Sequence, residues 1–376
     1  MFHRLTIIVA AALVSVGGAV QAQEAPSRAL PVYVGGRVIA DADGGLTFGW
    51  PGVYFEARFT GEAVRVRFDA PAEHMRVLID GQERAAFRRP GLVDLTLDGL
   101  SPGDHVVRLE KQTESQTGGG RFIAFEAVGG SVALPIVPRP RQIEFIGDSY
   151  TVGYGNTSAR RECTAKEVHA YTDTQQAFGP RVARSFDADY RTHAYSGFGI
   201  VRNYAGSSPD LSLPTLYDRL KPDDGDRRVE ASDDWRPQVI VINLGTNDFS
   251  TPLGPAERWA DDAGLRADYR QRYAAFVRQL AQAQPQARFI LMGSDAFYGD
   301  VEAVASVLDG ELRGRLTTLA FRDLELSGCD WHPSLSDDTR IADLLQATIR
   351  TMGVWDVSGP VDAAPGFAQS SSHDRR

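Results

Sequence analysis

The sequence predicts an α/β protein built from two units: an amino-terminal β-sandwich with a jelly-roll-like layout, then a three-layer α/β/α unit with a mainly parallel sheet. Three observations support this fold class. Apolar and polar residues alternate with a period of two through residues 31–130, a stiff proline-rich segment follows at 134–140, and buried-strand patterns then alternate with helical ones. We therefore expect the sandwich over residues 30–133 and the α/β/α unit over residues 141–355.

The first unit contains several short segments in which every second residue is apolar, the pattern of strands with one buried face. Turn sequences such as Asp80-Gly81 and Pro102-Gly103-Asp104 separate them. The expected strands are Val53–Phe59, Ala63–Phe68, Met75–Ile79, His105–Leu109 and Phe122–Val128.

The second unit alternates continuous apolar runs with longer helical periods, which indicates strands that are buried on both faces and joined by helices. Parallel sheets of this kind bind ligands at the carboxyl ends of their strands. The expected strands are Gln142–Ile146, Asp189–Ala194, Gln238–Leu244 and Arg288–Met292, and the clearest helices are Leu265–Gln284 and Asp338–Met352.

Composition and charge narrow the class of partner. The chain has 376 residues, 43% of them hydrophobic and 24% charged, as in ordinary globular proteins with room for two cores. A formal net charge of -9 argues against nucleic acid or an anionic membrane surface as the main partner. Residues 1–22 have the basic start, short apolar run and small-residue end of a signal peptide, which predicts a secreted or periplasmic protein, although a retained anchor is an alternative. Residues 356–376 are expected to form a flexible tail.

The stretch from Ile143 to Ser149 is a β-branched and aromatic run that stops abruptly at Gly147. This pattern indicates a buried strand with Ser149 at the carboxyl edge of the sheet, where a following helix would direct its N–H dipoles at an anion. Ser149 is therefore the candidate nucleophile, with Asp148 bracing the turn. A Gly-Asp-Ser turn by itself more often only reverses the chain. Thr151 stands where the Gly-x-Ser-x-Gly nucleophile elbow would need glycine.

Two distant segments support this candidate. The predicted strand over residues 238–244 ends in Gly245-Thr246-Asn247-Asp248, so the Asn247 amide can point at the same space as Ser149, the alternative being a simple turn. Asp330 and His332 lie two residues apart before Pro333, in a stretch expected to be extended. Residues two apart in an extended chain face one side, so Asp330 could hold Nδ1 of His332 and leave Nε2 to take the serine proton.

An oxyanion hole needs preorganised N–H donors beside the nucleophile. The segment 195–203 offers two glycines. We favour Gly199, because it directly precedes a segment that could start a helix; Gly197 would then only end the strand in a turn. The predicted donors are the N–H groups of Ser149 and Gly199 and the side chain of Asn247.

Together these blocks resemble the SGNH (GDSL-type) hydrolases. A β-rich start followed by Phe-Ile-Gly-Asp-Ser-Tyr-Thr-Val-Gly-Tyr-Gly-Asn and ending in Cys-Asp-Trp-His-Pro-Ser resembles, more narrowly, carbohydrate esterase family 2, the acetyl xylan esterases, over roughly residues 30–355. The resemblance implies a serine esterase that removes acetyl groups from plant polysaccharides such as xylan, often from the 6-O position of hexose units. It implies no metal and no organic cofactor.

One spacing departs from the wider family. Most SGNH hydrolases place the acid three residues before the histidine, where this chain has Cys329, whereas Asp330 lies only two before. Family 2 esterases resemble this chain in that spacing, and some use a Ser/His dyad in which a backbone carbonyl orients the imidazole. Cys163 and Cys329 are the two cysteines of the chain, and a disulfide between them and two free thiols are both consistent with the sequence.

The expected partner is an acetylated polysaccharide or oligosaccharide, with no nucleic acid, no membrane and no obligate protein partner. Trp331 either stacks on a sugar ring or packs over His332, and Trp259 and Tyr204 are weaker candidates for stacking. The β-sandwich either covers the second unit or helps to bind carbohydrate. Two alternatives remain: a lipase- or thioesterase-type esterase on small or lipid esters, and a non-catalytic carbohydrate-binding protein of the same fold.

Overall fold

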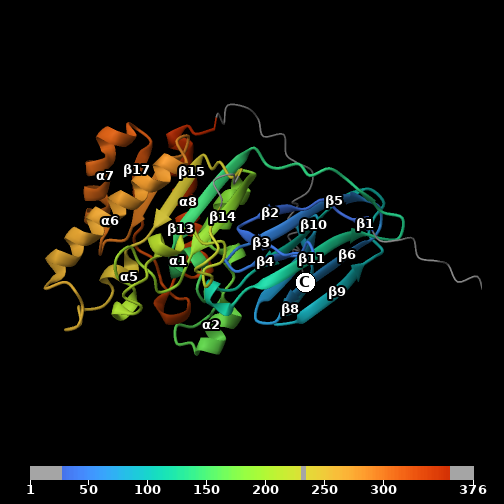
Figure 1. Cartoon of the computed structure of the whole chain (residues 1–376), viewed down its shortest axis with the longest axis horizontal. Coiled ribbons are helices and arrows are strands. Elements are labelled where there is room, and N and C mark those ends of the chain that lie inside the picture. Colours follow the sequence, from blue (N-terminus) through green and yellow to red (C-terminus); the bar gives the residue numbers. More distant parts are fainter. Residues whose placement is uncertain (1–27, 230–233, 356–376) are drawn as a thin grey trace, which may run out of the picture.

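The structure is a computed structural model that describes residues 28–229 and 234–355. The predicted signal peptide (1–22) and flexible tail (356–376) lie outside the described residues. In the described part, no helix combines the length and hydropathy needed to cross a membrane. An antiparallel unit and a parallel α/β unit lie side by side (Figure 1), and the predicted fold class is confirmed.

The amino-terminal unit is a pair of antiparallel sheets, with strand orders β3-β4-β11-β6-β9 and β12-β5-β10-β7-β8. Their inner faces share one hydrophobic core, in which Phe55 of β5 stacks on Phe122 of β11 with 4.4 Å between ring centroids. The strands are β1 (Arg28–Ala29), β2 (Tyr33–Gly35), β3 (Val38–Ala40), β4 (Leu46–Phe48), β5 (Tyr54–Thr60), β6 (Val64–Ala70), β7 (His74–Ile79), β8 (Gln82–Arg88), β9 (Gly91–Leu97), β10 (Asp104–Lys111), β11 (Gly120–Ala127) and β12 (Val132–Ala133), with a short 3-10 helix η1 (Ser115–Thr117).

The second unit has a five-stranded sheet in the order β14-β13-β15-β16-β17, in which every pair of neighbours is parallel. The four predicted strands are confirmed to within one residue at each end. The strands are β13 (Arg141–Gly147), β14 (Ala188–Ala194), β15 (Val239–Asn243), β16 (Arg288–Gly293) and β17 (Leu316–Ala320). The α-helices are α1 (Ser149–Val152), α2 (Ala165–Tyr171), α3 (Phe178–Ser185), α4 (Leu213–Leu216), α5 (Thr246–Phe249), α6 (Asp262–Ala283), α7 (Tyr298–Leu312) and α8 (Leu335–Met352), with 3-10 helices η2 (Thr174–Gln176), η3 (Tyr204–Gly206) and η4 (Cys329–Trp331).

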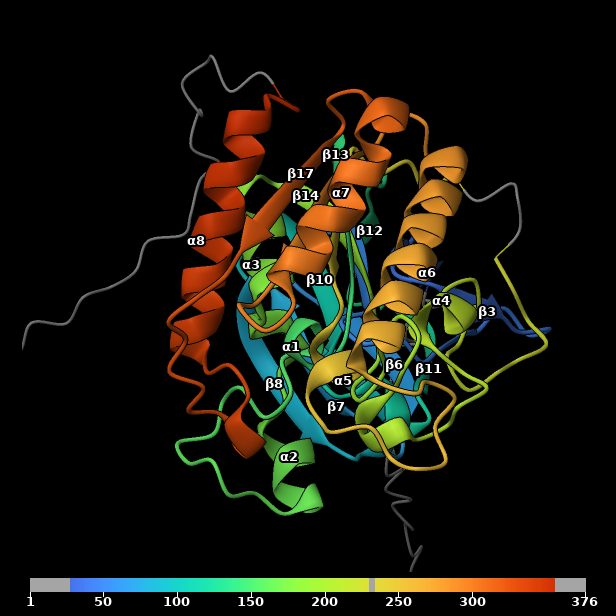
Figure 2. The ribbon, with the colours of Figure 1, turned by 90° about the vertical axis from the view of Figure 1, so that its left-hand side faces the viewer.

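The predicted three layers are present. Along β15, Ile240 and Ile242 belong to the core beneath α6 and α7, whereas Val239 and Val241 belong to the core beneath α3 and α8. Figure 2 shows these two helix pairs on opposite faces of the sheet. Because both faces are covered, the strands are continuous apolar runs, and this is why the sequence reveals them.

The sandwich packs against the β14 edge of the parallel sheet. Tyr54 of β5 donates a hydrogen bond to Asp189 of β14 (2.9 Å), and its ring contacts that of Tyr190. The indole N–H of Trp50 reaches the backbone carbonyl of Arg219 at 3.1 Å. This interface brings a loop of the sandwich close to the end of β14, where the candidate site lies.

Candidate active site

Ser149 lies where the sequence places it, at the corner between β13 and the one-turn helix α1. Its side chain is only 4% exposed. Asp148 caps the helix by accepting a hydrogen bond from the Tyr150 N–H (3.1 Å), so it braces the turn as predicted. The strand-to-helix corner thus presents the Ser149 hydroxyl at the carboxyl edge of the sheet.

His332 comes from the far end of the chain and meets this serine. Its Nε2 lies 2.8 Å from Ser149 Oγ, the distance of a good hydrogen bond. Burial lowers the pKa of His332 below its usual range, although hydrogen bonds from its ring to the carbonyls of Cys329 and Asp330 act in the opposite direction. The imidazole is therefore neutral near pH 7, with Nε2 able to accept the hydroxyl proton.

The predicted hydrogen bond between the Asp330 carboxylate and His332 is wrong. Nδ1 of His332 faces the backbone carbonyls of Cys329 (3.0 Å) and Asp330 (3.1 Å) instead. The physical reason is local: the chain is not extended here but forms the 3-10 helix η4, with Asp330 in the left-handed region (φ 50°). That conformation turns the carboxylate away and the carbonyls inward. The Asp330 carboxylate accepts a hydrogen bond from the Tyr154 hydroxyl at 3.0 Å.

Tyr154 is a residue that the sequence did not single out. Its ring stacks on the His332 imidazole with 4.3 Å between centroids, and Tyr150 contacts the imidazole edge-on at 5.5 Å. Burial and the Asp330 carboxylate raise the pKa of Tyr154, so its hydroxyl stays a donor. The residue that stacks on the imidazole is therefore Tyr154 and not Trp331. Trp331 is 55% exposed to solvent.

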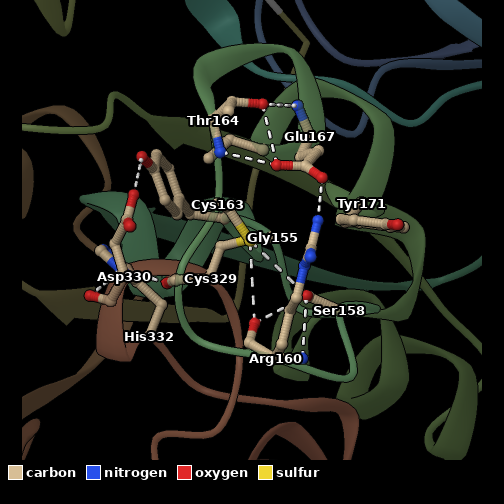
Figure 3. The surroundings of a disulfide bond; sticks show 12 residues. Gly155, Ser158, Arg160, Cys163, Thr164, Glu167, Tyr171, Cys329, Asp330 and His332 are labelled. Atoms are coloured by element: carbon tan, nitrogen blue, oxygen red, sulfur yellow. Dashed lines mark hydrogen bonds and ion pairs between the residues drawn. A yellow bond between two sulfur atoms is a disulfide. The ribbon is translucent and has the colours of Figure 1, made fainter.

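A disulfide joins Cys163 to Cys329, which resolves the two possibilities that the sequence left open. Figure 3 shows the bond between the loop after Ser149 and the segment that carries His332. The same two segments are joined by backbone hydrogen bonds, from Cys329 N–H to Gly155 O and from Asp330 N–H to Arg161 O. Gly155 is packed so closely that a Cβ there would lie 2.3 Å from Cys329 Cβ. The histidine segment is thus fastened to the serine loop.

Asn247 is the second residue of the short helix α5, which follows β15, and its side chain reaches Asp148 at the serine corner. Its Nδ2 donates to Phe198 O at 2.9 Å and makes a longer contact, 3.3 Å, with Asp148 Oδ2. One amide hydrogen is therefore committed to the backbone. The other is held weakly beside the corner that bears Ser149.

Gly199 is not placed as predicted. Its N–H donates to Asn203 Oδ1 at 3.2 Å, and no helix begins after it, because the N–H groups of the next three residues bind the Asp248 carboxylate at 2.9 to 3.0 Å. Glycine is required there for space: a Cβ would lie 2.2 Å from Asp248 Oδ2 and 2.3 Å from Arg202 O. Gly199 closes a packed loop and has its donor already engaged.

Gly197, the other glycine of this segment, has instead an N–H that is free within the described residues. It lies in the turn after β14, a strand whose last residue, Ala194, pairs with Gly147 next to the serine corner. Within residues 28–229 and 234–355, no acceptor binds the N–H of Gly197, and the same holds for the N–H of Ser149. A signal for this choice existed: Ser196-Gly197 has the composition of a turn with glycine at its third position.

Two buried carboxyl groups lie under the site. Burial and the neighbouring Asp248 carboxylate raise the pKa of Asp148 to about 7. Burial raises the pKa of Asp248 to about 6, against the lowering effect of the three backbone N–H groups that it binds. Burial thus raises the pKa of both carboxyl groups towards neutral pH. Among the described residues, no group of three or more His, Cys, Asp or Glu side chains could hold a metal ion.

The weaker aromatic candidates are Trp259, which lines a separate cavity, and Tyr204, whose backbone N–H donates to Gly197 O at 2.8 Å. Trp259 donates through its indole N–H to Asp268 (3.0 Å), and the Arg258 guanidinium covers its ring at 4.4 Å. It lines a cavity of about 400 Å³ that is formed by residues in the ranges 201–211 and 254–259, and neither Ser149 nor His332 lines this cavity. Tyr204 is 56% exposed.

Comparison with known proteins identifies the family of this chain. The carbohydrate esterase 2 N-terminal family model matches residues 34–136, and the GDSL-like lipase/acylhydrolase family model matches residues 145–349. An acetylxylan esterase / glucomannan deacetylase from Cellvibrio japonicus is 44% identical over 340 residues, which cover 88% of this chain and 93% of that protein.

Solved structures of similar architecture include carbohydrate esterases. A carbohydrate esterase whose active site displays catalytic and non-catalytic binding functions superposes with a TM-score of 0.80 and 43% identity over 87% of this chain and 100% of that one. A family two carbohydrate esterase from Clostridium thermocellum in complex with cellohexaose has a TM-score of 0.75 and 27% identity over 86% of this chain and 100% of that one. The chain is therefore a carbohydrate esterase that belongs to the GDSL-like lipase/acylhydrolase family and, within it, to carbohydrate esterase family 2.

Proposed function

We propose that this esterase removes O-acetyl groups from plant polysaccharides, either acetylxylan or 6-O-acetylated hexose units, through an acetyl-serine intermediate. The observation that carries the proposal is the 2.8 Å hydrogen bond between Ser149 Oγ and His332 Nε2. The related Cellvibrio protein is named an acetylxylan esterase / glucomannan deacetylase, which supports the acetyl group as the one removed.

In the first half-reaction, Ser149 Oγ attacks the acetyl carbonyl carbon while its proton passes to Nε2 of His332. The tetrahedral intermediate then collapses, the bond to the sugar oxygen breaks, and His332 returns the proton to that oxygen. In the second half-reaction, a water molecule takes the place of the sugar hydroxyl. Attack of this water on the acetyl-serine releases acetate and restores the Ser149 hydroxyl.

The oxyanion of each intermediate needs fixed donors in a site sheltered from water. We assign this role to the N–H groups of Ser149 and Gly197 and to the Nδ2 of Asn247. Gly197 replaces Gly199 in this assignment because the Gly199 N–H is bound to Asn203. The free N–H groups of Ser149 and Gly197 follow neighbouring strands, β13 and β14, at the same edge of the sheet.

The orientation of His332 is assigned to backbone carbonyls. The Nδ1–H donates to the carbonyls of Cys329 and Asp330, which keeps Nε2 unprotonated and facing Ser149. Asp330 acts here through its main chain, and its carboxylate serves to hold Tyr154 against the imidazole. The site is thus proposed to run on a Ser149/His332 dyad.

Trp331 is the proposed contact for the sugar. More than half of Trp331 is exposed, and it directly precedes His332 in the chain. A flat indole surface suits the apolar face of a pyranose ring.

We also propose that residues 1–22 direct export and are removed after Ala22. Sequencing the amino terminus of the exported protein would test this cleavage site.

The experiment for the proposed function is acetate release from a panel of esters. Acetylated xylan and acetylated glucomannan should release acetate, and a long-chain acyl ester should react far more slowly. The Ser149→Ala variant should be inactive on all of them. If the long-chain ester were the best substrate, the assignment of substrate class would be wrong even with Ser149 confirmed as the nucleophile.

A further inference from the structure

A loop of the β-sandwich binds the turn that carries Gly197. Gln116, in η1 between β10 and β11, donates from Nε2 to the backbone carbonyl of Ser196 at 2.7 Å. The hydroxyl of Ser196 lies 2.7 and 2.9 Å from the two carboxylate oxygens of Glu114. The amino-terminal unit therefore binds both the side chain and the carbonyl of the residue that precedes Gly197.

The turn that carries Gly197 has the geometry of a type II β-turn. Residues 195–198 form a β-turn closed by a hydrogen bond from Phe198 N–H to Tyr195 O, and Gly197 has φ 83°. A positive φ at the third position is the mark of a type II turn, and a type I turn differs mainly by a flip of the central peptide. Because a peptide is planar and trans, its C=O and N–H point in opposite directions. The direction of the Ser196 carbonyl therefore fixes the direction of the Gly197 N–H.

We propose that Gln116, supported by Glu114, is a positioning residue of the oxyanion hole: by binding the Ser196 carbonyl it holds the Gly197 N–H on the opposite side of the peptide, towards the reacting oxygen. This inference rests on the proposed function, in which Gly197 donates to the oxyanion. It gives the β-sandwich a part in catalysis, because residues 114 and 116 belong to that unit while residues 196 and 197 belong to the other.

The loop that carries Gln116 is held in place by a buried carboxylate. Glu73, which is fully buried, accepts hydrogen bonds from the hydroxyls of Thr113 and Thr117 and from the Gly119 N–H (2.8 Å). It also pairs with the buried Lys111 ammonium at 3.1 Å. A loop fastened at three points to a buried ion pair is a rigid support. Fixed donors need such support, because a catalytic donor that reorients during the reaction loses its advantage.

The test uses Gln116→Ala, since Gln116 is exposed and its removal leaves both cores intact. With p-nitrophenyl acetate as substrate, kcat should fall about 3- to 10-fold, the value of one hydrogen bond, while KM stays within about twofold. The inhibition constant of phenylboronic acid, which forms a tetrahedral adduct with the serine, should rise by the same factor as kcat falls. Gln116→Glu, which keeps the size but removes the donor, should behave like Gln116→Ala.

Gln112→Ala is the matched control. Gln112 also crosses the interface between the two units, donating to Asp173 at 3.0 Å, but it does not contact Ser196. Its loss should leave kcat and the inhibition constant within about twofold of the parent values. Equal effects of the two variants would mean that the interface acts only through general stability, and that outcome overturns the proposal.

Gly197→Ala separates this proposal from the assignment on which it rests. Alanine disfavours a positive φ and so favours the flipped peptide, which should lower kcat by itself. In the Gly197→Ala background, Gln116→Ala should add less than about twofold, because both changes act on one peptide. If Gly197→Ala has no effect on kcat, Gly197 is not an oxyanion donor. The assignment of Gly197 to the oxyanion hole and the positioning role of Gln116 then both fail. If Gly197→Ala lowers kcat but Gln116→Ala does not, only the role of Gln116 fails.

Discussion

Nε2 of His332 lies 2.8 Å from Oγ of Ser149, although 183 residues separate the two in the chain. The contact is held by the Cys163–Cys329 disulfide, by the stacked Tyr154 ring and by the backbone carbonyls that accept from Nδ1 of the imidazole. These restraints act on the histidine, whereas the β13–α1 corner fixes the serine. Each can be tested separately.

The Asp330→Asn variant should keep most of the activity. Backbone carbonyls bind Nδ1 of His332, and asparagine keeps the size of the side chain, tolerates positive φ and can still accept from Tyr154. We expect kcat/KM within about fivefold of the parent. In a triad whose carboxylate orients the histidine, the same substitution lowers kcat about 10,000-fold. A loss of that size would return the orienting role to the Asp330 side chain.

The Asn247→Ala variant should fold but be severely impaired. Loss of one oxyanion donor typically lowers kcat about 100- to 1,000-fold, and we expect a loss in this range. The hydrogen bond to Phe198 O also disappears, so a modest fall in Tm should accompany it. Steady-state kinetics and thermal unfolding on the same preparation measure both. Activity within a few-fold of the parent would remove Asn247 from the oxyanion hole.

The sequence predicts a site residue well when a local pattern sets its position. It predicts poorly when a contact with a distant part of the chain does so. β13 and β15 were predictable because they are buried on both faces and so consist of apolar runs. β17 was missed because it is an edge strand, and each of its five residues is half-buried, which leaves a weak Leu-Thr-Thr-Leu-Ala pattern. Local motifs were enough to predict three site residues. Ser149 and Asn247 come shortly after β13 and β15, and His332 lies in the Asp-Trp-His motif near the end of the chain.

The failures concern backbone orientation. Gly197 and Gly199 are both glycines near a strand end, and the turn composition of Ser196-Gly197 is only a weak signal. The structure distinguishes them by the acceptors of their N–H groups, which are Asn203 for Gly199 and none for Gly197 within the described residues. Asp330 was placed on the wrong partner because η4 adopts a left-handed conformation that an Asp-Trp-His sequence does not indicate. Contacts made by Gln116 leave no local signal, since they come from the other unit.

Reduction of the disulfide should weaken both stability and catalysis. The bond closes 166 residues, and cross-links of such loops stabilise folded proteins by about 2–5 kcal/mol. The Cys163→Ser variant should have a lower Tm and a lower kcat, since the segment that carries His332 loses one attachment. Thiol titration of the denatured parent should find no free thiols before reduction and two after it. Two free thiols before reduction would contradict the bond.

The pH dependence of kcat/KM should show an acidic limb below pH 6.5. Only neutral His332 can accept the Ser149 proton, and the pKa of His332 is lowered by burial, so activity is lost only when the pH falls below the ordinary histidine range. Asp148, with its pKa raised to about 7, titrates nearby. Asp148→Asn, which keeps a good helix cap, should leave the limb in place. A half-maximal point at or above pH 6.5 in both proteins would contradict the assignment.

The dyad is tested most directly by the rate of p-nitrophenyl acetate hydrolysis by Ser149→Ala, His332→Ala and the double variant. Residues that act as a unit give non-additive losses, so each variant should lose about 10,000-fold or more in kcat/KM, and the double variant should lose no more than either alone. Hydrolysis by Ser149→Ala at close to the parent rate would contradict the account, because the acetyl group would then pass to another residue or directly to water.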